Sequence, residues 1–87
     1  MNSIEVLREA EKIARKQEIG VPEENFAGIA DMWGAYLDKE ITSVDVAMMM
    51  ALLKIVRIKA GTTTDDSFID LACYSAYAGE IAGWLRD

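Results

Sequence analysis

The chain has 87 residues, of which 52% are hydrophobic, and a formal net charge of −6 at pH 7. This length predicts one helical domain over residues 1–87, and the apolar content is too high for a disordered chain. The negative charge argues against direct nucleic-acid binding, which needs a basic face, and against docking on anionic membranes. The absence of histidine excludes His-based catalytic triads and most zinc sites.

The first segment is predicted to form a helix from about Ser3 to Gln17. Asn2, just before this helix, and Glu5, in its first turn, have the spacing of a capping box. Apolar residues spaced by three and four form one predicted core stripe, Ile4, Leu7, Ala10, Ile13 and Ala14. Its charged faces are interpreted as solvated. The segment does not resemble a signal peptide, and no apolar run reaches membrane-spanning length, so a cytoplasmic location is expected.

The second predicted helix runs from about Pro22 to Leu37. Glu23 and Glu24 suit its first turn, where the helix dipole favours negative charge. Residues with helical spacing form its predicted core face: Phe26, Ile29, Ala30, Trp33 and Leu37. Because the next connection is short, the third helix is expected to turn back antiparallel to this one.

The third predicted helix begins with a second capping box, Thr42 and Asp45, and extends to about Ala60. Its middle, "VAMMMALL", is apolar on every side. Such a helix is expected to be covered by neighbours, either in the same subunit or across a dimer.

The fourth predicted helix runs from about Asp65 to Arg86 and carries many small residues that permit close helix contacts. Cys73, the single cysteine, lies in an apolar run and is predicted to be a buried, reduced thiol. The sequence therefore predicts an all-α fold, a compact bundle of four helices that associates as a dimer or higher oligomer.

Two aspartates of the fourth helix suggest a site. Asp66 and Asp70 are four residues apart and project from the same face, where like charges repel unless a cation lies between them. Mg²⁺ prefers oxygen ligands, and carboxylates from two facing helices commonly supply them. If the second helix packs beside the fourth, the possible partners are Glu23, Glu24 and Asp31, and Glu24 is the one proposed as a metal ligand.

Lys54 and Arg57 lie three residues apart on one face of the third helix and are candidates for binding phosphate oxygens. A simpler alternative needs no metal. Asp70 could form a salt bridge with Lys54 or Arg57, and Asp66 could simply favour the helix N-terminus.

The segment "ITSVDVAMMMALLKIVRIKAG", followed by "DDSFIDLACYSAYAGEI", resembles a family of small proteins of unknown function encoded by bacteriophages and prophages. This resemblance covers roughly residues 25–81. It implies a phage or prophage source and assigns no activity.

A second resemblance is to the MazG-like all-α nucleoside triphosphate pyrophosphohydrolases, whose pattern is E-E-x-x-E on one helix and E-x-x-D on a later one. Glu23 and Glu24 look like the first pair, and Asp70 matches the later aspartate. Ser67 stands at the glutamate position, with Asp66 one residue away as a substitute. The resemblance implies a Mg²⁺-dependent dimer or tetramer that cleaves a nucleotide to its monophosphate and pyrophosphate.

Two functions are therefore expected. The first is a MazG-like nucleotide pyrophosphohydrolase or a nucleotide-binding relative that uses Mg²⁺. The alternative is a non-catalytic phage accessory protein that binds and modulates a host protein or sequesters a nucleotide.

Overall fold

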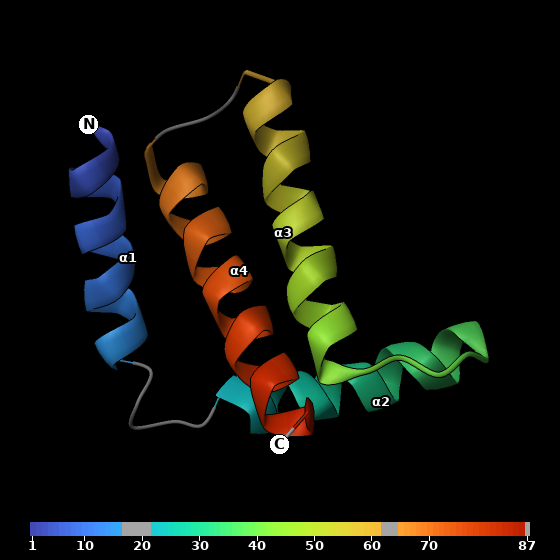
Figure 1. Cartoon of the computed structure of the whole chain (residues 1–87). Helices are drawn as coiled ribbons and strands as arrows, with labels where there is room; N and C mark the ends of the chain where they lie inside the picture. The colour runs from blue at the N-terminus through green and yellow to red at the C-terminus, as the bar shows by residue number, and fades with distance from the viewer. Residues whose placement is uncertain (17–21, 62–64, 87) are drawn as a thin grey trace.

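The computed structural model describes the backbone of residues 1–16, 22–61 and 65–86, and the side chains of residues 1–16, 25–61 and 65–83. The described residues form four helices and no strand: α1 (Ser3–Lys16), α2 (Pro22–Leu37), α3 (Ser43–Lys59) and α4 (Asp65–Arg86). The predicted all-α bundle of four helices is confirmed. In Figure 1, α4 lies between α1 and α3 and runs antiparallel to α3, while α2 lies across one end of the bundle.

Local sequence signals fix two helix starts. The Asn2 side chain accepts a hydrogen bond from the Glu5 N–H at 2.9 Å, and Glu5 accepts one in return. Thr42 and Asp45 form the same reciprocal capping box at α3, with bonds of 2.9 and 3.0 Å. Both predicted capping boxes are confirmed, because each satisfies N–H groups that a helix leaves unpaired at its start.

The turn at the end of α2 sets the orientation of α2 relative to α3. Asp38 adopts a left-handed backbone conformation with φ of 54°, and the Lys39 N–H donates to the Gly34 carbonyl oxygen at 3.1 Å. This is the bonding pattern of a Schellman motif. The chain then becomes extended at Thr42 before α3 begins. The expected antiparallel packing of α2 against α3 is therefore wrong: this turn sends α2 across the end of the bundle (Figure 1).

Two glycines of α2 are expected to respond oppositely to alanine. A Cβ at Gly34 would lie 2.8 Å from the Lys39 carbonyl oxygen, whereas a Cβ at Gly28 meets no atom within 4 Å. Gly34→Ala should therefore lower the free energy of unfolding by about 1–3 kcal/mol through backbone crowding. Gly28→Ala should raise it by about 0.5–1 kcal/mol, because alanine favours the helix. Urea denaturation of both variants checks this, and a stabilising Gly34→Ala would contradict the close approach.

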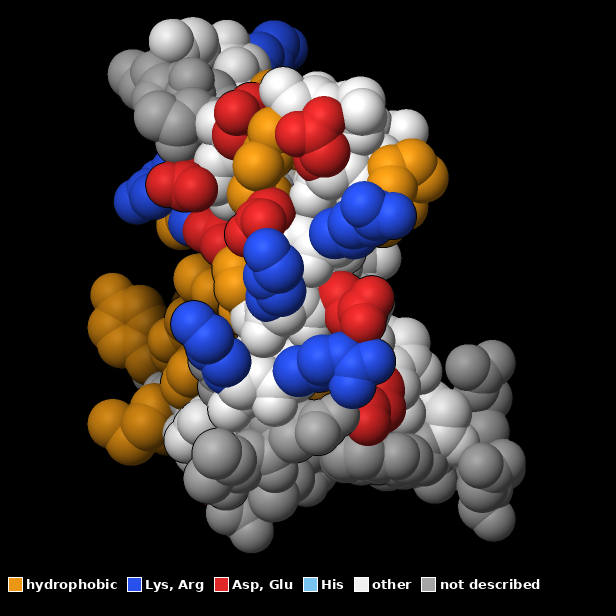
Figure 2. Space-filling view, turned by 90° about the vertical axis from the view of Figure 1, so that its left-hand side faces the viewer, with side chains coloured by type: hydrophobic (Ala, Val, Ile, Leu, Met, Phe, Trp, Pro, Cys, Tyr) orange, Lys and Arg blue, Asp and Glu red, His pale blue; other side chains and the backbone are white. Residues whose placement is uncertain are grey.

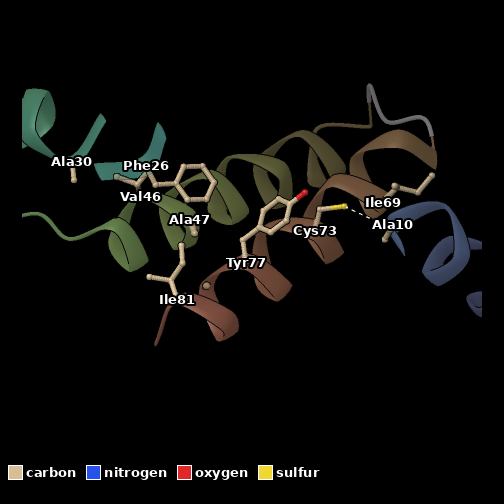
Figure 3. Close-up of a cluster of buried hydrophobic side chains, with 10 residues drawn as sticks. Ala10, Phe26, Ala30, Val46, Ala47, Ile69, Cys73, Tyr77 and Ile81 are labelled. Atoms are coloured by element: carbon tan, nitrogen blue, oxygen red, sulfur yellow. Dashed lines mark hydrogen bonds between the residues drawn. The ribbon is translucent and has the colours of Figure 1, made fainter. Parts of the chain in front are cut away.

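The core lies where all four helices meet. Val46 of α3 is fully buried and Ile81 of α4 is 2% exposed. The cluster combines small and large side chains: Ala10, Phe26, Ala30, Val46, Ala47, Ile69, Cys73, Tyr77, Ala78 and Ile81. Figure 3 shows this cluster running from α2 along the α3–α4 contact to α1. Cys73 is buried and unbridged, as predicted.

The predicted core stripe of α1 is partly wrong. Ile4 and Leu7 are more than half exposed, while Val6 packs against the core beside the buried Ala10. The charged faces are solvated as expected. Figure 2 shows acidic and basic side chains interleaved on this side of the molecule, and α1 carries exposed pairs such as Arg15 with Glu11 at 2.9 Å.

Helix α3 is not covered on every side within this chain. Val46, Ala47 and Ala51 are buried, but six apolar residues on the other side are exposed: Met48, Met49, Leu52, Leu53, Ile55 and Val56. The described residues therefore cover one face of α3 and leave the opposite apolar face exposed. None of the helices, over the residues described, combines the length and apolarity that a membrane span requires.

Candidate functional site

An ion pair joins α3 and α4, two of the three helices that carry the predicted site. The Lys54 Nζ lies 3.0 Å from the Asp70 Oδ2, across the contact between α3 and α4. The Lys54 side chain is only 12% exposed, whereas that of Asp70 is 37% exposed. Lys54 reaches this position because α3 places it near its buried face, where its aliphatic stem can pack while its ammonium group meets the carboxylate. The sequence left Lys54, Arg57 and a divalent cation open as partners of Asp70, and in the structure Asp70 pairs with Lys54.

The other predicted site residues have different surroundings. Asp66 is exposed and lies one helical turn before Asp70, on the same face of α4. Arg57 is exposed on α3, one turn after Lys54. The side chain of Glu24 lies outside the described residues. The metal-binding and phosphate-binding roles of these residues stay predictions.

The acidic side chains near Asp70 are the possible ligands for Mg²⁺. Among the described side chains, no three Asp, Glu, Cys or His residues lie close enough together to hold a metal ion. Mg²⁺ commonly takes only one or two protein carboxylates and completes its coordination with water and substrate phosphates. Asp66 and Asp70 supply two carboxylates on one face of α4, and Asp70 is paired with Lys54.

A cavity of about 270 Å³ lies beside Asp70, between α1, α2 and α4. It is lined by residues of these three helices: Ile13, Asn25, Phe26, Asp70, Cys73, Tyr74 and Tyr77. The Phe26 ring lies 6.4 Å from that of Tyr74 and 6.1 Å from that of Tyr77, with tilted planes in both pairs. The cavity therefore has aromatic walls and a carboxylate at its border.

Two polar groups at this cavity stay neutral. Burial raises the pKa of the Cys73 thiol, and the nearby Asp70 charge raises it further. The Cys73 thiol donates a hydrogen bond to the Ala10 carbonyl oxygen, with an S···O distance of 3.5 Å (Figure 3). Burial also raises the pKa of Tyr77, with smaller contributions from Cys73, Tyr74 and Glu80. Tyr77 therefore keeps its hydroxyl proton at neutral pH.

Sequence reasoning missed Tyr77 as a site residue. Its hydroxyl oxygen is buried and finds no hydrogen-bond partner within the described part of the chain. An aromatic residue at helical spacing is normally core filler, and most of the Tyr77 side chain does serve that purpose. The spacing of Asp70, Tyr74 and Tyr77, which places them along one face of α4, is the only signal that could have identified it.

The fold and site together define a small all-α protein in which a lysine–carboxylate pair borders an aromatic cavity. A family model described as a domain of unknown function, DUF6378, matches residues 5–82. The chain belongs to this family. The expected resemblance to a phage-encoded family of unknown function is thereby confirmed.

Relatives come from two mycobacteriophages. The chain is 42% identical over 73 residues to the Gene 55 protein of Mycobacterium phage D29, covering 80% of this chain and 48% of that protein. It is 42% identical over 74 residues to the Gene 55 protein of Mycobacterium phage L5, covering 80% and 47%. The chain thus spans about half the length of these curated relatives. No solved structure shows significant similarity to it.

Proposed function

We propose that this chain binds a nucleotide beside Asp70 and acts as a MazG-like, Mg²⁺-dependent nucleotide pyrophosphohydrolase. The supporting observation is the 3.0 Å contact between Lys54 and Asp70. It brings a residue proposed to bind phosphate against a residue proposed to bind metal. Within this pair the two charges offset each other, so Lys54 would bind phosphate oxygens once Mg²⁺ takes its place at Asp70.

The proposed roles follow from the chemistry of each side chain. Asp66, Asp70 and Glu24 would hold Mg²⁺, and Lys54 and Arg57 would bind phosphate oxygens. Bound Mg²⁺ would neutralise the phosphates and make a water molecule more acidic. Arg57 offers a planar fork of donors that matches phosphate geometry, whereas Lys54 offers a compact charge. The residues of this chain would therefore mainly position the nucleotide and stabilise its charge.

Metal titration tests the proposal. Isothermal titration with Mn²⁺ or Mg²⁺ in the presence of a nucleotide is expected to show binding that Asp70→Asn weakens by at least about tenfold, because a carboxylate ligand is lost. Asp65→Asn is the matched control, since Asp65 is also exposed and lies on the same helix. Its metal affinity should match that of the parent chain.

Turnover is measured separately. Incubation with standard and modified deoxynucleoside triphosphates, read out as released pyrophosphate, should show Mg²⁺-dependent product that Asp70→Asn abolishes. Absence of metal binding at millimolar concentration would end the enzymatic proposal.

A second candidate is a non-catalytic phage accessory protein that sequesters a nucleotide or modulates a host protein in the host cytoplasm. The observation favouring it is the same ion pair, because Lys54 already neutralises Asp70 without any metal. Sequestration predicts nucleotide binding without turnover. Modulation of a host protein predicts neither nucleotide binding nor turnover. It predicts that the chain captures one defined host protein and that this capture depends on the acidic surface.

A further inference from the structure

The hydroxyl of Tyr77 is a buried polar group without a hydrogen-bond partner among the described residues. Tyr77 as a whole is 9% exposed. Burying a hydroxyl without a partner is costly, and buried polar groups in folded proteins are nearly always satisfied. Cys73 lies one turn earlier on α4, and its thiol donates its hydrogen bond to the Ala10 carbonyl oxygen. In Figure 3 the hydroxyl points away from Ile81 and toward the Cys73 end of the cluster.

The cavity lined by Tyr77 has a specific chemical character. Phe26 and Tyr74 give it aromatic walls, and Asp70 and Asn25 add polar groups at its border. A carboxylate there disfavours an anion but accepts hydrogen bonds from amino and imino groups. The neutral Tyr77 hydroxyl can donate and accept. A planar heteroaromatic ring matches this combination, since its face packs against aromatic side chains and its edge makes hydrogen bonds.

The volume of the cavity limits the size of the ligand that it can hold. The cavity volume of about 270 Å³ lies just below the range of about 300–1,000 Å³ typical of sites for drug-sized ligands. It suits a base rather than a whole nucleotide, with sugar and phosphates left outside near Asp70 and Lys54.

We propose that this cavity binds a nucleobase whose hydrogen-bonding edge meets the Tyr77 hydroxyl. The proposal rests on the proposed function in one respect: the base would belong to the nucleotide whose phosphates lie beside Lys54 and Asp70.

Deoxynucleosides without phosphate test the cavity alone. Each of the four standard deoxynucleosides is titrated into the chain without metal, and binding is followed by NMR chemical shifts. At least one should bind saturably, and Tyr77→Phe should weaken it about three- to tenfold through loss of one hydrogen bond. Tyr36→Phe is the control, because Tyr36 is 88% exposed and lies at the far end of α2. Tyr77→Phe should keep or raise Tm, which separates lost binding from lost folding.

The outcomes separate the two proposals. Absence of saturable binding, or equal binding by Tyr77→Phe, would overturn the base site. If metal binding at Asp70 persisted in that case, the proposed function would survive. Nucleoside binding without any metal binding would support the base site and remove the Mg²⁺-dependent function.

Helix α3 independently carries a second inference. Its exposed face is a line of residues seven apart, Asp45, Leu52 and Lys59, flanked by apolar side chains. The apolar residues are arranged symmetrically about Leu52: Met48 and Val56 are each four residues away, and Met49 and Ile55 are each three away. Leu52 is 58% exposed and Val56 is 67% exposed.

This pattern is self-complementary. A two-fold axis through Leu52 would pair α3 with α3 of a second copy in antiparallel orientation, which sets Met48 against Val56 of that copy. The same axis would set the acidic Asp45 near the basic Lys59 at both ends. We infer that α3 forms a homodimer interface with this register, which would cover the apolar face that this chain leaves exposed.

Cysteine crosslinking tests the register. Leu52→Cys should form an intermolecular disulfide under mild oxidation, because the axis brings the two copies of residue 52 together. Val56→Cys alone should crosslink much less, whereas a mixture of Met48→Cys and Val56→Cys chains should crosslink with each other. The parent chain, whose single cysteine Cys73 is buried, serves as the background control.

Mass measurement tests the association itself. Sedimentation equilibrium should show a dimer that Leu52→Glu converts to monomer and that Lys59→Glu weakens. Lys39→Glu changes the net charge equally outside α3 and should have no effect. A chain that stays monomeric at all concentrations, or a Leu52→Cys variant that does not crosslink, would overturn this interface.

Discussion

Replacing Asp70 by asparagine is expected to lower the free energy of unfolding by about 1–3 kcal/mol. The variant leaves the Lys54 ammonium, on a side chain only 12% exposed, without its charged partner. Breaking a fully buried pair costs about 3–5 kcal/mol, and the expected value is smaller here because Asp70 is 37% exposed. Urea denaturation measures the change, with Asp65→Asn expected to stay within about 0.5 kcal/mol of the parent chain.

A double-mutant cycle isolates the pair itself. Lys54→Met keeps most of the buried stem and removes the charge, so the cost in the Asp70→Asn background should be smaller than in the parent chain. We expect a coupling energy of about 1 kcal/mol. Additive effects of the two substitutions would show that the 3.0 Å contact contributes nothing to stability.

This stability effect also sharpens the functional test. If Asp70 serves a metal, then Asp70→Asn should reduce metal affinity in a protein that is still folded at the assay temperature. Lys54→Met provides the comparison, because it removes the competing cation and leaves the carboxylate in place. Tighter metal binding by Lys54→Met than by the parent chain would indicate that Lys54 and the metal compete for Asp70.

Local signals in the sequence were sufficient to predict where the helices lie along the chain. Capping pairs such as Thr42 and Asp45 act within one turn, so their effect does not depend on the rest of the fold. The core face of α1 was harder to predict. Ile4, Val6, Leu7 and Ala10 form overlapping apolar stripes, and only packing against α4 selects the one containing Val6 and Ala10.

The candidate site shows the same division between local and tertiary information. The spacing of Asp66 and Asp70 is a local property, and it placed them on one face of α4. The choice of Lys54 as the partner of Asp70 depends on how α3 packs against α4, so the sequence could only name it among alternatives. The cavity beside Tyr77 needs three helices to form, which no spacing rule within one helix can reveal.

Ile81→Ala is expected to have the largest effect on stability, a loss of about 2–5 kcal/mol, because it leaves a cavity in a packed core. Ile81 is 2% exposed and belongs to the same buried cluster as Val46 and Ala47 (Figure 3). Single domains have about 5–15 kcal/mol of total stability, so this variant should be close to unfolding. Ile55→Ala is the matched control, since Ile55 is 46% exposed and should cost less than about 0.5 kcal/mol in the monomer.

Protein concentration then distinguishes core packing from association. The loss in Ile81→Ala reflects packing within one chain, so it should be similar at low and high protein concentration. If α3 pairs with a second copy, Ile55→Ala should instead become more destabilising relative to the parent chain as concentration rises, because the parent gains stability from dimerisation. Thermal denaturation at several concentrations measures both trends. A concentration-independent Ile55→Ala would place the stability of this fold entirely within one chain.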